Sequence, residues 1–186
     1  MGKTNSVEPI REQSAIDDIA EKLKEYSQRD YVLFYMGIYL GRRISDILSL
    51  KVKDVKDKDY IYFREMKTNK ESYIAINSKL KRILKAYCRD KKSSEYLFPP
   101  LRGKKNRHIT RQQYWNVLNK AAKEVGYKDK IGCHSLRKTL GRKLYEEGYD
   151  VAVIQMILGH SDMNVTKRYI GVTTDEVNSI LKKLKI

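Results

Sequence analysis

Apolar side chains recur along most of this chain at the three- and four-residue spacing of an amphipathic helix. From Ser14 onward, for example, Ile16, Ile19, Ala20 and Leu23 share one helical face. The same spacing predicts further helices, which cover approximately residues 30–40, 44–50, 80–87, 111–125, 135–147, 150–158, 165–169 and 175–186.

Two of these helices carry signals for capping or burial. Residues 30–40 are apolar almost all round, which predicts a helix buried on every side, and Asp30 is its expected N-cap. Thr110 is the expected N-cap of the helix that follows it, and we assign Trp115 and Leu118 of that helix to the core.

Strand-like sequence is confined to one region. Tyr60–Met66 is rich in aromatic and β-branched residues, and Ser72–Ile76 follows after a link short enough for a hairpin. The predicted fold is therefore mainly α with one small antiparallel β-sheet, an α+β class. The polar residues 1–11 are predicted to be a linker or the remnant of an arm, and residues 12–186 form a single domain.

The composition points to the kind of partner. The chain has 186 residues, of which 41% are hydrophobic, enough for a packed core in one domain. Its formal net charge of +16 favours a polyanionic partner, and nucleic acid is the commonest one.

The cysteines and the hydropathy pattern point to a cytoplasmic protein. Cys88 and Cys133 lack CxxC spacing, so we expect neither a structural zinc site nor a disulfide framework. No apolar run approaches the ~18 residues that a membrane span needs, and Met1–Thr4 does not resemble a signal peptide. We therefore expect no membrane contact.

Residues that can act on a phosphodiester gather between residues 134 and 169. His134 and Arg137 lie three residues apart, so on a helix they share a face and can address one anion. His160 and Tyr169 follow them; arginine can hold phosphate oxygens, and tyrosine can serve as a nucleophile. No acidic cluster with metal-ligand spacing stands out, so we expect no metal and no other cofactor.

The order and spacing of five motifs resemble the tyrosine recombinase (phage integrase) family. They are Gly41–Leu50 (GRRISDILSL), Lys67-Thr in the predicted hairpin, His134-Ser-Leu-Arg137, Leu158-Gly-His160, and Tyr169. Each motif alone is weak, whereas five in the family's order are specific. The resemblance covers residues 12–186 and implies the fold of the family's catalytic domain.

The resemblance implies a role for each matching residue. Arg43 and Arg137 are similar to the two arginines that clamp the scissile phosphate in this family. Lys67 resembles the lysine that protonates the leaving 5′ oxygen. His134 resembles the residue that helps to manage the tyrosine proton, and His160 resembles the one that binds a phosphate oxygen.

Tyr169 resembles the family's nucleophile, which forms a covalent 3′-phosphotyrosine link with DNA. The implied activity is site-specific recombination of double-stranded DNA, in which strands are cleaved and rejoined without ATP or a metal. The family also implies self-association into a tetramer on the DNA.

Some assignments have competitors in the sequence. Arg42 stands beside Arg43, but the following Ile-Ser-Asp fits the family motif in register with Arg43. Lys70 competes with Lys67 for the role of the acid. Asp46 matches an acidic position of the family, to which we assign a supporting, structural role.

Other basic residues are predicted to bind the DNA backbone. Arg42 stands where the family usually has a small or apolar residue, and Arg168 directly precedes Tyr169. The loop after Pro99-Pro100 supplies the remaining candidates, which are Arg102, Lys104, Lys105 and Arg107. The alternative for this loop is a solvated segment without DNA contacts.

Two other functions are compatible with parts of the pattern. Type IB topoisomerases share the catalytic plan but relax DNA without exchanging partners, and a DNA-binding regulator would keep the fold without the chemistry. Compact spacing favours a recombinase, and the complete catalytic set argues against a regulator.

Full-length members carry a core-binding domain, and often an arm-binding domain, before this one, so we expect a catalytic-domain fragment or a minimal member.

Overall fold

The computed structural model describes residues 7–64, 69, 71–103, 106–160, 162–171, 178 and 182. Their helices and strands are α1 (Gln13–Tyr26), α2 (Gln28–Leu40), α3 (Ile44–Leu48), the 3-10 turn η1 (Val52–Asp54), β1 (Tyr60–Arg64), β2 (Glu71–Ala75), α4 (Ser78–Tyr87), α5 (Arg111–Glu124), α6 (Cys133–Glu146), α7 (Val151–Leu158) and α8 (Met163–Ile170).

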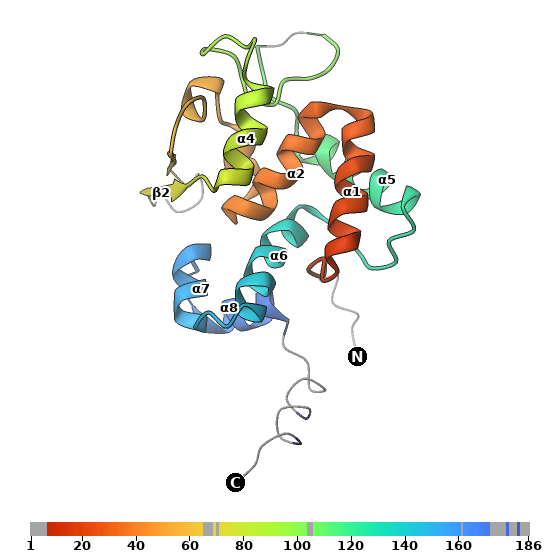
Figure 1. The fold of residues 1–186 in the computed structure, drawn as a ribbon, viewed down its shortest axis with the longest axis vertical. Coiled ribbons are helices and arrows are strands. Elements are labelled where there is room, and N and C mark those ends of the chain that lie inside the picture. The colour runs from red at the N-terminus through yellow and green to blue at the C-terminus, as the bar shows by residue number, and fades with distance from the viewer. Residues whose placement is uncertain are drawn as a thin grey trace.

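The strands β1 and β2 pair in antiparallel fashion, with Tyr62 opposite Tyr73. The described residues thus form a mainly helical fold with a two-stranded sheet, which confirms the predicted class. Figure 1 shows α1, α2, α4 and α5 together in the upper body, while α6 leads down to α7 and α8. The helix expected over residues 175–186 lies, apart from Asn178 and Lys182, outside the described residues.

Helix α2 forms the centre of the main core. Its side chains Val32, Leu33, Phe34 and Met36 are fully buried, as their apolar pattern predicted. Helices α1, α4 and α6 pack around it. The helix with the most continuous apolar sequence is therefore the one that the others cover.

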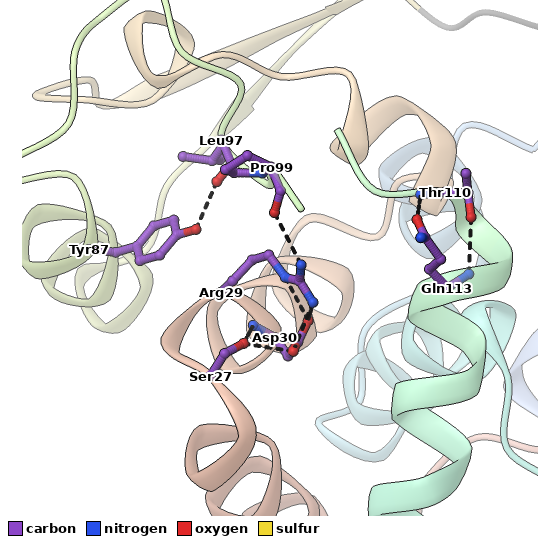
Figure 2. Close-up of polar contacts among 8 residues, drawn as sticks. All are labelled: Ser27, Arg29, Asp30, Tyr87, Leu97, Pro99, Thr110 and Gln113. Atoms are coloured by element: carbon purple, nitrogen blue, oxygen red, sulfur yellow. Dashed lines mark hydrogen bonds and ion pairs between the residues drawn. The ribbon is translucent and has the colours of Figure 1, made fainter. Parts of the chain in front are cut away.

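The start of α2 differs from the prediction. Its N-cap is Ser27, whose side-chain oxygen accepts a hydrogen bond from the backbone N–H of Asp30. Asp30 is buried and forms an ion pair with Arg29, whose guanidinium also donates to the carbonyl of Pro99 at 3.1 Å (Figure 2). Asp30 therefore lies within the first turn, in a polar network that ties α2 to the segment before α5.

Helix α5 begins where it was predicted to begin, but it buries only one of the two residues that were assigned to the core. Thr110 and Gln113 form a reciprocal capping box at its start (Figure 2). Leu118 is fully buried, as expected, whereas Trp115 is 42% exposed, so its assignment to the core was wrong. The indole of Trp115 instead lies beside Gly132, just before α6.

Two glycines set how closely α2 approaches the C-terminal helices. A Cβ on Gly37 would lie 2.5 Å from Cδ1 of Leu136, so glycine permits the close packing of α2 on α6. Gly41 ends α2 with a φ of +57°, and a Cβ there would lie 2.6 Å from Cδ2 of Leu140. The chain turns at this contact, and Arg43, after the intervening Arg42, is the N-cap residue of α3.

Helices α6, α7 and α8 enclose a second, smaller apolar cluster. Ile154, Leu158 and Ile170 are fully buried in it, and Leu140 and Tyr169 pack against them from α6 and α8. Because this cluster is separate from the main core, the placement of Tyr169 depends on the three C-terminal helices.

The chain before α1 packs on α6 from residue 7 onward. Ile10 is fully buried, and its backbone N–H donates to Oγ1 of Thr139 at 2.8 Å. Nζ of Lys138 donates to the carbonyl of Val7, also at 2.8 Å. Residues 7–11 are therefore part of the folded body, and the linker prediction for residues 1–11 stays a proposal about domain organisation.

Candidate active site

The first turn of α6 places a histidine and an arginine side by side. The backbone N–H of Gly132, the N-cap residue, donates to Oγ of Ser135 at 3.1 Å, which fixes the start of the helix. His134 is exposed at this end, and Arg137 is 3% exposed one turn later. Arg137 Nη2 donates to the carbonyl of Leu158 at 2.5 Å, so its guanidinium also links α6 to the end of α7.

His160 follows the tight turn that ends α7. Gly159 adopts a φ of +68°, and the backbone N–H of His160 returns to the carbonyl of Gln155 at 3.1 Å. The Nδ1 atom of His160 lies 2.9 Å from Oγ1 of Thr166, a fully buried residue of α8. This hydrogen bond fixes the imidazole against the helix that carries Tyr169.

Tyr169 lies one residue before the end of α8, where its hydroxyl faces His134 and its ring lies beside His160 and Arg137. Its hydroxyl lies 3.4 Å from Nδ1 of His134, and its ring packs edge-to-face on His160 with centroids 4.5 Å apart. The guanidinium carbon of Arg137 lies 5.8 Å from the centroid of the tyrosine ring. Three helices and one turn thus bring these four predicted residues together.

Several positive charges surround His134. The pKa of His134 is lowered, first because neighbouring groups desolvate the ring, and then by the charges of Arg111, Arg137, Arg43 and Lys138. Arg43, the N-cap residue of α3 and distant from His134 in the sequence, therefore acts electrostatically on the same site. A neutral imidazole beside a tyrosine hydroxyl is suited to accept its proton.

The stretch of chain that forms this site matches a known protein family. A model described as "Phage integrase family" matches residues 11–176. The chain belongs to this family.

The matched relatives are integrases and recombinases. The chain is 42% identical over 176 residues to a probable integrase/recombinase, YoeC, of Bacillus subtilis, and the match covers 95% of this chain and 96% of that protein. It is 29% identical over 160 residues to tyrosine recombinase XerA of Pyrococcus horikoshii, with 85% of this chain and 55% of that protein covered. The chain thus spans about half the length of this Xer recombinase and nearly all of YoeC.

Solved structures show the same fold. A crystal structure of XerA recombinase superimposes with a TM-score of 0.79 at 21% identity and covers 100% of this chain and 68% of that chain. A crystal structure of lambda integrase bound to DNA gives a TM-score of 0.71 at 19% identity, with 100% and 66% covered. With the family match, they identify a tyrosine-type site-specific recombinase catalytic domain.

The two arginines of the first family motif differ in exposure. Arg43 is half-buried, whereas Arg42 is only 5% exposed. The greater access of Arg43 favours it over Arg42 as the ligand of a phosphate in this phage integrase domain. Asp46 is 3% exposed, which suits the structural role expected of it.

Sequence reasoning missed two cations of the site. Lys138 places its Nζ 5.6 Å from the centroid of the Tyr169 ring, and burial lowers the pKa of this lysine. The position of Lys138 directly after Arg137 in the sequence could have indicated that it lies near the site. Arg111 acts on His134 from the start of α5, and no local pattern links two residues so far apart along the chain.

The described structure does not test the remaining predicted site residues. Lys67, its competitor Lys70, and the loop residues Lys104 and Lys105 lie outside the described residues, as does the side chain of Arg168. Arg102 and Arg107 are exposed. The DNA contacts expected of these basic residues and of Arg42 therefore stay predictions.

Metal-ligand clusters and membrane-spanning helices are absent from the described residues. Among them, no group of three or more His, Cys, Asp or Glu side chains is placed to hold a metal ion. No helix in this part of the chain is long and apolar enough to cross a membrane. Cys88 and Cys133 are both free thiols and are buried.

Proposed function

We propose that this phage integrase domain cleaves and rejoins double-stranded DNA through a covalent 3′-phosphotyrosine at Tyr169. The supporting observation is the position of the Tyr169 hydroxyl, 3.4 Å from Nδ1 of His134 and beside the guanidinium of Arg137. Nucleophile, base and phosphate-binding cation thus share one site. Structures of similar fold, such as that of lambda integrase, were solved bound to DNA.

The proposed step exchanges one phosphodiester for another. Oη of Tyr169 attacks the scissile phosphorus and gives up its proton toward His134. The bond between phosphorus and the 5′ oxygen breaks, and Lys67 protonates that oxygen as it leaves. A 5′-hydroxyl from the same or another strand reverses the step, so no net bond energy is lost.

Three side chains stabilise the negative charge that builds on the non-bridging oxygens. Arg43 and Arg137 bind these oxygens, and His160 donates one further hydrogen bond from its Nε2 atom. For this donation the proton must be on Nε2, so Nδ1 of His160 accepts a hydrogen bond from Oγ1 of Thr166. A Thr166 hydroxyl that donates to Nδ1 is compatible with the tautomer that the phosphate needs.

Strand exchange requires more than one copy of the domain. We propose that it acts as a tetramer on two DNA duplexes, because each protomer supplies one tyrosine and exchange needs four cleavages. Mass photometry of DNA-bound protein would test this: complexes with four protomers are expected, and complexes limited to one protomer would contradict it.

The test of the activity uses a pool of nicked duplexes with randomised sequence around the nick. The nick lets the short cleaved fragment diffuse away, so a covalent adduct accumulates and survives denaturation. An adduct is expected with the wild-type chain and with Tyr149→Phe, since Tyr149 is 49% exposed and outside the site. None is expected with Tyr169→Phe.

Two outcomes would overturn the proposal. One is the absence of any adduct from the wild-type chain at high protein concentration. The other is an adduct that persists in Tyr169→Phe. Relaxation of supercoiled DNA without exchange of strands between molecules would instead identify a topoisomerase.

A further inference from the structure

Two guanidinium groups converge on the last backbone carbonyls of α8. Nη2 of Arg11 donates to the carbonyl of Gly171 at 3.2 Å. Nη1 of Arg142 lies 3.4 Å from the same oxygen and 3.5 Å from the carbonyl oxygen of Ile170. These carbonyls carry the negative end of the helix dipole and accept no further bond from the helix itself.

One turn of α6 holds both arginines in place. Nε of Arg142 donates to Oε1 of Glu146 at 2.7 Å, and Arg142 is 7% exposed. Nζ of Lys143 donates to the backbone carbonyl of Arg11 at 3.0 Å and lies 3.6 Å from Oε2 of Glu146. Arg11 is therefore fixed by its backbone as well as by its side chain.

The contact between these arginines and the end of α8 matters because α8 carries Tyr169. Tyr169 precedes the two clamped carbonyls by one and two residues, and α8 has only eight residues. A helix this short gains little stability from its own hydrogen bonds, so contacts at its ends decide how long it stays formed. With the end of α8 in this position, the hydroxyl of Tyr169 lies 3.4 Å from Nδ1 of His134.

We propose that Arg11 and Arg142 are positioning residues that hold the end of α8 and thereby keep Tyr169 at His134 before DNA binds. The proposal rests on the proposed role of Tyr169 as the nucleophile. Through Arg11, the segment before α1 then affects the placement of the nucleophile, although it contributes no group to the reaction.

Amide hydrogen exchange of the whole chain without DNA is the first readout. The variants are Arg11→Ala, Arg142→Lys and Arg142→Ala, with Arg89→Ala as the control because Arg89 is exposed and distant from the site. Exchange in the peptide covering residues 163–171 is expected to rise about tenfold in Arg11→Ala and Arg142→Ala. Arg142→Lys should restore part of the protection, and α1 to α5 should be unchanged.

The second readout is the rate of adduct formation at saturating protein with the randomised nicked duplexes. Arg11→Ala should lower this rate severalfold while leaving the apparent Kd for the duplex pool unchanged. The proposal is wrong if exchange in α8 stays at the wild-type level, if it rises equally throughout the fold, or if adducts form at the wild-type rate despite faster exchange. Faster exchange confined to α8, together with no adduct even from the wild-type chain, would support the clamp and refute the proposed activity.

Discussion

His134 stands next to the Tyr169 hydroxyl, where desolvation and then the surrounding positive charges lower the pKa of its ring. A lowered pKa keeps the imidazole neutral near pH 7, which is the form able to accept a proton. The same shift affects stability. Below the ordinary pKa of ~6.5 the unfolded chain binds this proton more readily than the folded one, so His134 destabilises the fold as the medium becomes acidic.

The first prediction concerns the pKa of His134, measured by NMR titration of its ring carbon and proton signals. In the wild-type chain the pKa should lie below ~6.5, and Arg111→Ala should raise it because one repelling charge is removed. Arg89→Ala, at a distant exposed position, should leave it unchanged. A pKa at or above the ordinary value, or no response to Arg111→Ala, would show that these cations do not surround the ring.

The second prediction concerns Arg137, whose loss should slow the chemistry far more than it weakens DNA binding. Arg137→Ala removes a cation that the proposed transition state needs, so the rate of adduct formation should fall by about 10²–10³. Binding of the duplex pool, measured by fluorescence anisotropy, should weaken far less because the chain carries 39 Lys and Arg residues over which backbone binding can be spread. A rate within a few-fold of wild type would contradict the assignment of Arg137 to the phosphate.

Single residues were predictable where the sequence places them close together. His134 and Arg137 share one helix turn, and Tyr169 follows His160 within a short segment, so the motifs alone indicated one site. Arg111 and Lys138 were missed for different reasons. Arg111 reaches the site only through the packing of α5 on α6, whereas Lys138 was hidden by its more recognisable neighbour Arg137.

At the scale of elements, the turn at Gly41 connects the main core to the C-terminal helices. Gly41→Ala should destabilise the fold for two reasons, since its φ of +57° is unfavourable for alanine and the new Cβ would meet Leu140 at 2.6 Å. Gly126→Ala is the matched control, because Gly126 has a φ of +72° and a Cβ added there would meet no atom within 4 Å.

Urea denaturation separates these two effects. Gly126→Ala should lower the free energy of unfolding by about 1–2 kcal/mol, which is the cost of the backbone conformation alone. Gly41→Ala should cost at least about 1 kcal/mol more because of the steric contact. Equal losses in the two variants would show that the turn at Gly41 does not press against α6.

The positions of the helices were predictable from the sequence, whereas the cap of α2 and the burial of individual side chains were not. The spacing of apolar residues located α1 to α8 to within a few residues, because burial of one face selects the helical period. Asp30 was a plausible cap by type, but Ser27 caps α2 while Asp30 pairs with Arg29. Trp115 has the composition of a core residue, yet Tyr114 beside it takes the buried position, and only the packing of α5 decides between them.

On the scale of the whole molecule, the site draws residues from the end of the main core and from the three C-terminal helices. Arg43 comes from the end of the main core, while His134, Arg137, His160 and Tyr169 come from the C-terminal helices. The family resemblance implied that Arg43 and Arg137 hold one phosphate, and both charges contribute to the lowered pKa of His134. Lys67, which resembles the acid of the family, lies outside the described residues, and its role stays a prediction.

Peptide mapping of the trapped adduct tests the central claim most directly. The adduct formed on the randomised nicked duplexes is trimmed with nuclease, digested with protease and sequenced by tandem mass spectrometry. Among the 14 tyrosines of the chain, the account predicts a phosphonucleotide on Tyr169. A phosphonucleotide on any other residue would contradict it.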